Sequence, residues 1–137
     1  AWRRVLVLTL LAMLLAALVS RGLSSAWPAP RPFALGLGHQ WLAHKATPSF
    51  PSSHASVAFA FGFALLRLIP HRVGRWVPLG LALLVGWGRL ALGLHFPLDV
   101  LAGVVVGALS WALAHALLKL ATSDRPAAQA QMPLRRS

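Results

Sequence analysis

The chain has 137 residues, 58% of them hydrophobic and 11% charged, with 13 lysines and arginines against two carboxylates. So few charges exclude an ordinary soluble domain, in which roughly 25% of the residues are charged. The two carboxylates, Asp99 and Asp124, are too few for paired-acid catalysis or a carboxylate-rich metal cage. The lack of cysteine excludes disulfides and a thiol nucleophile.

Four apolar segments are long enough, or nearly so, to cross a bilayer as helices: 5–23, 55–69, 77–94 and 98–120. A spanning helix needs about 20 mostly apolar residues, so the second segment requires tilt or added residues at its start. The first segment also resembles a signal peptide, but its length and the turn-rich sequence after it favour a retained helix. We predict an all-α fold, a polytopic membrane helix bundle with about four transmembrane helices, forming one domain over residues 1–121.

Basic residues gather in alternate connections of this bundle: before the first segment, between the second and third, and after the fourth. This bias predicts that these connections are cytoplasmic, as is the tail 122–137, which we expect to be disordered. It also predicts that His54 and His95 lie together at the outer membrane face. The sequence has no basic surface interleaved with aromatic residues, so a nucleic-acid partner is not expected.

Five prolines in residues 24–53 argue against a long helix there, and we expect only a short interfacial helix over 34–44. In the run Pro-Ser-Phe-Pro-Ser-Ser-His at 48–54, Ser52 or Ser53 is a good N-cap for the next helix. The free N–H groups of a helix start attract an oxyanion, and the histidine that ends the run is placed to protonate a leaving group. The alternative is a plain helix cap beside an interfacial histidine.

The apolar helix 77–94 contains Arg89, and a cation inside a membrane is costly unless it meets an anion or water. Asp99, or a bound phosphate, would supply that anion. Pro97 suits the first turn of a helix and places Asp99 near the third position. There the carboxylate either complements the helix dipole or accepts a hydrogen bond from one nitrogen of His95. In the second case, the other ring nitrogen is free to act as a nucleophile.

Two further cations are expected at the outer face: Arg21 at the exit of the first helix, and Arg31 in an Arg-Pro dipeptide. Guanidinium groups form strong charge-assisted hydrogen bonds to phosphate oxygens. Both arginines are therefore candidate phosphate ligands, although a loop arginine is more often simply solvated.

Together these clusters resemble the motifs of the type 2 phosphatidic acid phosphatase superfamily. Its third motif, Ser-Arg-x5-His-x3-Asp, is matched in spacing by Arg89, His95 and Asp99. Its second motif, Pro-Ser-Gly-His, is matched by residues 51–54, and the Arg-Pro that ends its first motif by residues 31–32. The resemblance covers residues 21–115. It implies a six-helix core with the active site at the outer face, so two N-terminal helices of that core would be absent here.

Within the family, Arg-Pro-Phe followed closely by Ser-Phe-Pro-Ser-x-His is most similar to bacterial undecaprenyl-diphosphate phosphatases of the bacitracin-resistance type. This resemblance implies a metal-independent enzyme without a cofactor that hydrolyses a polyprenyl diphosphate to the monophosphate. It also implies a multi-pass protein of the bacterial inner membrane whose active site faces the periplasm. Its partners would be the lipid phosphate or diphosphate substrate and membrane lipids.

The same resemblance assigns roles to residues of this chain. It implies that His95 is the nucleophile that forms a phosphohistidine, that Asp99 orients it, and that His54 is the acid. The implied phosphate ligands are Arg31, Arg89, Ser52 and the amide of Ser53, with Arg21 as a substitute for a missing lysine.

Three departures from the family pattern bear on activity. Ser24 stands where the first motif has lysine, Ser53 replaces the glycine of the second motif, and Gly88 replaces the serine of the third. Because the motifs bind phosphate and say little about the lipid, a phosphatidylglycerophosphate or phosphatidic acid phosphatase is one alternative. A non-catalytic lipid-phosphate-binding protein is another. A further hypothesis is a zinc site formed by His39, His44, His54 and His95.

Overall fold

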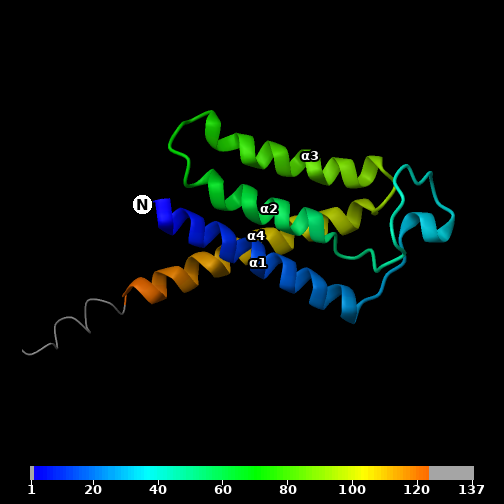
Figure 1. Cartoon of the computed structure of the whole chain (residues 1–137), viewed down its shortest axis with the longest axis horizontal. Helices are drawn as coiled ribbons and strands as arrows, with labels where there is room; N and C mark the ends of the chain where they lie inside the picture. Colours follow the sequence, from blue (N-terminus) through cyan, green and yellow to red (C-terminus); the bar gives the residue numbers. More distant parts are fainter. Residues whose placement is uncertain (1, 124–137) are drawn as a thin grey trace, which may run out of the picture.

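A computed structural model describes residues 2–123, so the predicted tail 122–137 lies outside the described residues except for its first two, which end the last helix. All regular secondary structure in the described chain is helical, as predicted (Figure 1). Its α-helices are α1 (Trp2–Ala26), α2 (Ser53–Leu66), α3 (Val77–Ala91) and α4 (Pro97–Ser123). Two short 3-10 turns, η1 (Pro32–Leu35) and η2 (Gly74–Trp76), lie in the connections.

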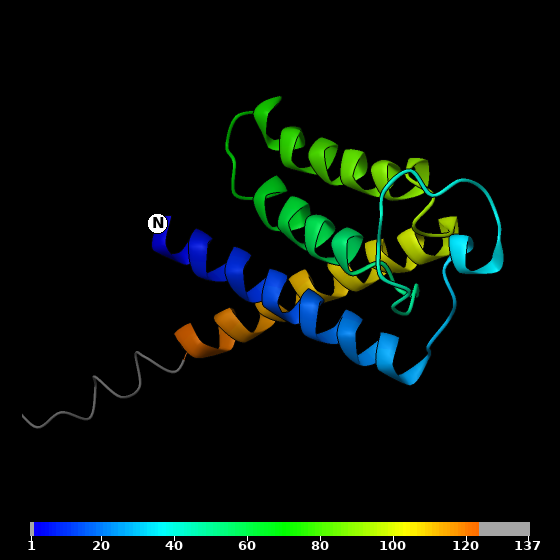
Figure 2. The same cartoon turned by 45° about the vertical axis from the view of Figure 1, so that its right-hand side comes forward.

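Helix α2 lies at the centre of the bundle and packs against the other three α-helices, whereas α3 packs mainly against α2 at the edge. Figures 1 and 2 show that successive helices run in opposite directions. The ends of α1 and α3, the starts of α2 and α4, and the long connection 27–52 therefore meet at one end of the molecule. We call this the site end, because it brings the predicted segments around His54 and His95 together.

Small residues allow α2 and α4 to approach closely. A Cβ atom added at Gly103 would lie 2.7 Å from the Cβ of Ala55, and one added at Gly107 would lie 2.8 Å from the backbone nitrogen of Ala60. Such spacing of glycines on a membrane helix permits tight packing against a neighbour. This close packing fixes the start of α4 beside the start of α2.

The molecule carries its large apolar side chains outside and its small ones inside. Much of the core consists of alanine: Ala12, Ala16, Ala60, Ala64 and Ala114. Large exposed apolar side chains include Leu10, Leu14, Leu84, Leu101 and Leu109. An apolar surface of this extent is unfavourable in water, and small residues at helix interfaces are typical of membrane bundles.

Two of the four predicted spans, α1 and α4, are long and apolar enough to cross a membrane. Helices α2 and α3 have 14 and 15 residues, which gives each a length of roughly 21–23 Å against an apolar thickness of about 30 Å. Relative to the predicted spans, α2 ends three residues early, at Leu66, whereas α3 ends three residues early at the site end, at Ala91. Ser52 caps α2, and Gly93, with a φ of 69°, turns the chain away from the end of α3 before residue 94.

The predicted interfacial helix over 34–44 is wrong. Only the 3-10 turn η1 forms, and Gly36, whose φ is 68°, ends it in the left-handed conformation. The chain then continues without regular structure, and the backbone N–H of Trp41 donates to the carbonyl of Leu92 (3.4 Å). This contact ties the connection 27–52 to the turn between α3 and α4.

Candidate active site

Arg31 anchors the connection 27–52 over the turn between α3 and α4. Its side chain is buried, and its Nε donates to the carbonyl of Thr47 (2.9 Å). Its Nη1 donates to the carbonyl of Leu94 (3.0 Å) and lies 3.0 Å from Nε2 of His95. The arginine of the predicted first cluster and the histidine of the third are therefore in direct contact.

The contact with Arg31 fixes the tautomer of His95. A guanidinium group has only donors, so Nε2 of His95 must be the acceptor and the ring proton must reside on Nδ1. Nδ1 lies 3.4 Å from Oδ2 of Asp99 and 3.3 Å from Oγ of Ser49. The imidazole thus directs a lone pair toward Arg31 and its N–H toward a carboxylate, which is the arrangement that nucleophilic catalysis by histidine requires.

Asp99 is buried in the first turn of α4, where Pro97 begins the helix as predicted. Its Oδ2 accepts a hydrogen bond from the backbone N–H of Phe96 (2.8 Å) and another from the hydroxyl of Ser49. The two interpretations of this carboxylate, helix stabilisation and orientation of His95, are therefore compatible, because one oxygen serves both.

Arg89 does not pair with Asp99, contrary to one of the two expectations for its counter-ion. Its Nε and Nη2 atoms are buried and have no hydrogen-bond partner among residues 2–123. The carboxylate of Asp99 instead accepts hydrogen bonds from Ser49 and Phe96, two neighbours of His95. Uncompensated buried donors are costly, so these two N–H groups are available to an acceptor from outside the described chain.

A cavity of about 330 Å³ opens beside His95. Arg31 and His95 line its buried side, and Arg21 and Ser53 line it nearer the surface. Ser24, which stands where the family motif has lysine, also lines the cavity, but its hydroxyl donates to the carbonyl of Phe50 (3.0 Å). Arg21 and Arg31 supply the positive charge of this cavity.

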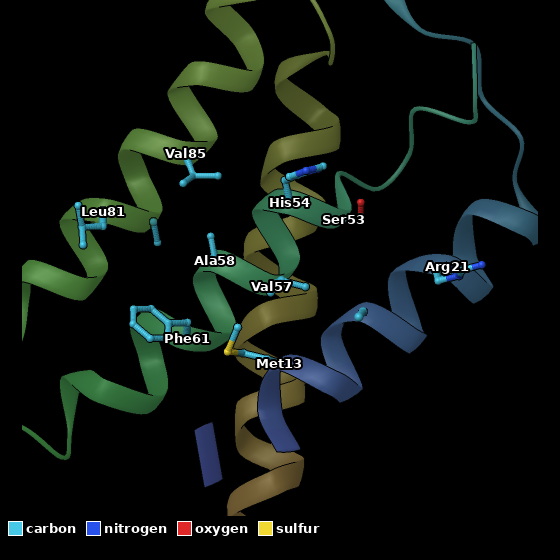
Figure 3. A pocket seen from close by; sticks show the side chains of 11 residues that line it. Met13, Arg21, Ser53, His54, Val57, Ala58, Phe61, Leu81 and Val85 are labelled. Carbon is cyan, nitrogen blue, oxygen red and sulfur yellow. The ribbon is translucent and has the colours of Figure 1, made fainter. Parts of the chain in front are cut away.

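His54 lines a second, larger cavity of about 660 Å³ that shares Arg21 and Ser53 with the first. Figure 3 shows this groove, with Ser53 and His54 at the start of α2 and apolar residues of α1, α2 and α3 further along. The charge of Arg89 and the ring of His95 are close enough to His54 to influence it electrostatically. The structure thus places His54 at the site end, exposed, and in the cavity adjoining that of His95.

The two serines before His54 have different surroundings. Ser52 is fully buried; it caps α2 by accepting a hydrogen bond from the N–H of Ala55 (3.4 Å), and its own N–H donates to the carbonyl of Asp99 (3.0 Å). Ser53 is exposed and lines both cavities. In the described chain no hydrogen bond uses the N–H groups of Ser53 and His54, so they remain available to an anion, as is typical of a helix start.

The local electrostatics favour a neutral imidazole at His95. Burial lowers the pKa of His95 below its ordinary value of 6.5; its hydrogen bond to Asp99 opposes this effect, and the charge of Arg31 adds to it. Burial and the charge of Arg89 likewise lower the pKa of Arg31. Near neutral pH the site therefore presents an unprotonated Nε2 among arginines, which suits attack on an anionic phosphorus centre.

Sequence reasoning missed two residues of this site, Ser49 and Thr47. Ser49 is fully buried against the His95–Asp99 pair, and Thr47 accepts hydrogen bonds from Arg31 through both its carbonyl and its Oγ1. Ser49 belongs to the run 48–54, but nothing in its spacing predicts a contact with Asp99.

The zinc hypothesis finds no support. Among residues 2–123, no three metal-ligating side chains lie close enough together to hold a metal ion.

Comparison with known proteins agrees with this geometry. Residues 5–123 match the PAP2 superfamily. The chain is 36% identical to YbjG of Escherichia coli K12 over 110 residues, which is 78% of this chain and 54% of that protein. It is 39% identical to undecaprenyl-diphosphatase BcrC of Bacillus subtilis over 77 residues, which is 56% of this chain and 39% of BcrC.

A solved structure shares the fold. The crystal structure of LpxE from Aquifex aeolicus matches with a TM-score of 0.73 and 26% identity, covering 83% of this chain and 68% of LpxE. The chain thus spans about half the length of YbjG and less of BcrC. With the motif residues gathered at one end of a helical bundle and the family matched over nearly the whole length, the chain belongs to the PAP2 superfamily.

Proposed function

We propose that the protein is an integral membrane lipid phosphatase that works through a phosphohistidine at His95, without a metal or cofactor. The observation that carries the proposal is the position of Nε2 of His95, which is unprotonated and whose lone pair faces a guanidinium nitrogen of Arg31 at 3.0 Å. Arg89 nearby supplies buried donors that have no partner within the described chain. A nucleophile beside unpaired cations suits a phosphoryl group better than a neutral substrate.

The proposed reaction has two steps. Nε2 of His95 attacks phosphorus, the bond from phosphorus to the bridging oxygen breaks, and His54 protonates the departing oxygen. His54 then removes a proton from water, which attacks phosphorus, releases inorganic phosphate and restores His95. Asp99 stabilises the charged ring through Nδ1 in the first step.

The phosphoryl oxygens need donors at the same place. Arg31, Arg89 and the amide of Ser53 are the proposed ligands, and Arg21, at the mouth of the cavity, is the proposed substitute for the lysine that Ser24 replaces. Ser52 contributes indirectly, because its cap directs the start of α2 toward the cavity.

The adjoining groove supports a lipid as the substrate. Its polar end, formed by Arg21, Ser53 and His54, borders the proposed phosphate site, and the remainder is lined by apolar residues such as Val57, Phe61 and Leu81. From His54 to Phe61 the groove follows α2 for roughly 10 Å. An amphiphile with an anionic head and a hydrocarbon chain matches both parts.

Undecaprenyl diphosphate is the proposed substrate, and the product is its monophosphate. BcrC of Bacillus subtilis carries the name undecaprenyl-diphosphatase, and the run Ser-Phe-Pro-Ser-x-His is present here at 49–54. We further propose that the protein resides in a bacterial inner membrane with its site end facing the periplasm. Phosphatidylglycerophosphate and phosphatidic acid remain the alternative substrates, because the proposed phosphate ligands contact only the head group.

The test is phosphate release by the full chain purified in detergent, with undecaprenyl diphosphate, phosphatidylglycerophosphate and phosphatidic acid offered separately in the presence of a chelator. We expect turnover of the polyprenyl diphosphate, its loss in His95→Ala, and wild-type turnover in His71→Ala, a histidine in the turn before η2. Tight binding of the lipid phosphates without turnover would establish the non-catalytic alternative. Undiminished turnover by His95→Ala would reject the mechanism.

A further inference from the structure

We propose that Ser49 is a positioning residue of this active site: its hydroxyl holds the carboxylate of Asp99 and shares the Nδ1 proton of His95. Nε2 is thereby kept as the acceptor that faces the phosphoryl group. The inference rests on the proposed phosphatase function, and it adds to that function a residue to which the motifs assign no role.

The geometry places Ser49 between the two partners. Its side chain is fully buried, its Oγ donates a hydrogen bond to Oδ2 of Asp99, and the same Oγ lies 3.3 Å from Nδ1 of His95. Its backbone N–H donates to the carbonyl of Ala29 (2.8 Å), two residues before Arg31. Ser49 therefore links the segment that carries Arg31 to the pair that Arg31 faces.

The direction of each hydrogen bond follows from the number of protons available. Nε2 of His95 accepts from Arg31, so Nδ1 carries the ring proton. A serine hydroxyl has one proton, which goes to Asp99, and its lone pairs then accept from Nδ1–H. The ring proton is thus shared between the serine and carboxylate oxygens, at 3.3 and 3.4 Å from Nδ1. With both oxygens on one side of the ring, its rotation is restricted.

Removal of the hydroxyl has a specific electrostatic consequence. Oδ2 of Asp99 would keep the Phe96 N–H but lose one of its donors, so more negative charge would remain on the carboxylate that faces the ring. The charged and titratable groups around His95 are Arg31 from the connection 27–52, Asp99 from α4, Arg89 from α3 and His54 from α2. The ring also loses the neutral Oγ acceptor, but a carboxylate stabilises the protonated ring more strongly than a hydroxyl does. The protonated form of His95 is therefore favoured, and the pKa of His95 rises.

The first experiment compares Ser49→Ala with Ser56→Ala. Ser56 is equally buried, and its hydroxyl donates to the carbonyl of Ser52 (2.9 Å) within the start of α2, so its loss removes a comparable hydrogen bond away from His95. We expect similar falls in unfolding temperature for both. Only Ser49→Ala should lower kcat, by roughly 10- to 100-fold, as expected for a lost hydrogen bond to a charged group. Its KM should change less than twofold.

A purely structural role for Ser49 predicts a different result. In that case kcat/KM of Ser49→Ala falls at the same acidic pH as kcat/KM of the wild type. A positioning role predicts instead that the fall in the variant moves to higher pH. A fall at the wild-type pH, or an equal loss of kcat in Ser56→Ala, would overturn the proposal. Ser49→Cys, which keeps the shape and a weak donor, should fall between the wild type and Ser49→Ala.

The second experiment does not need turnover. The His95 ring is titrated by NMR in protein labelled with 15N-histidine, for the wild type and Ser49→Ala without substrate. A higher pKa of His95 in the variant supports the positioning role, and an identical titration overturns it. If the wild type releases no phosphate from any lipid, the phosphatase proposal fails while the titration still decides the role of Ser49.

Discussion

Replacement of Arg89 by methionine tests whether the site is built around an anion. Methionine keeps much of the apolar stem, but it removes the charge and the two buried N–H donors, Nε and Nη2, that have no partner among residues 2–123. Each unsatisfied buried donor costs roughly 1–3 kcal/mol. Without an anion, Arg89→Met should therefore raise the free energy of unfolding by about 2 kcal/mol, the lower bound for two such donors.

The same change should weaken anion binding. Two charge-assisted hydrogen bonds contribute roughly 1.5–3 kcal/mol each, so the affinity for phosphate or vanadate should fall by roughly 10²- to 10⁴-fold. The assay is thermal unfolding in detergent with and without the anion. At 100 times its Kd, the anion should stabilise the wild type by about 2.7 kcal/mol and the variant hardly at all.

Arg67→Met is the matched control, because Arg67 lies at the opposite end of α2 from the site, with its guanidinium group 5.6 Å from the ring centre of Trp111. This variant should keep the stabilisation by anions. If Arg89→Met is less stable than the wild type without anion and yet is stabilised by phosphate as the wild type is, then Arg89 has a structural partner and the argument from its unpaired donors is refuted.

Three further predictions concern the residues around His95. Asp99→Asn should lower kcat by roughly 10³-fold while a purified sample still binds phosphate, because an amide cannot stabilise the charged ring as a carboxylate does; an unchanged kcat would contradict the role of Asp99. Since burial lowers the pKa of His95, kcat/KM should decline only as the pH falls below 6.5, with its midpoint under that value. Over the same range the unfolded chain binds this proton more readily, so the free energy of unfolding falls as well; a midpoint above 6.5 would show that the ring is not desolvated. Gly93→Ala should destabilise the protein by at least about 1–2 kcal/mol, because of its φ of 69° and because the added Cβ would collide with the backbone carbonyl of His39. Gly22→Ala, in open space on α1, should not; equal melting temperatures would count against the turn geometry.

Much of the site arrangement was predictable because it depends on topology. Alternating basic connections placed His54 and His95 at one end of the bundle, and the structure brings the starts of α2 and α4 together there. The contact between His95 and Asp99 was also predictable, because only the short turn into α4 separates the two residues.

The remaining features depend on contacts between distant segments, which spacing does not encode. Arg31 contacts His95 across 64 residues, and Ser49 contacts Asp99 across 50. Asp99 was one of the two expected counter-ions of Arg89, beside a bound phosphate, because the chain has so few acids. In the structure, the carboxylate of Asp99 instead accepts hydrogen bonds from Ser49 and Phe96. The interfacial helix failed for a local reason, since Gly36 adopts a left-handed conformation that ends η1 after one turn.

The most direct test of the account is to trap the phosphorylated enzyme. The purified full chain is mixed with substrate labelled in its terminal phosphate, quenched with base within milliseconds to seconds, digested, and sequenced by mass spectrometry. The account predicts an acid-labile, base-stable phosphate on Nε2 of His95, absent from His95→Ala and scarcer in Asp99→Asn. A label on His54, or turnover without any phosphorylated histidine, would contradict it.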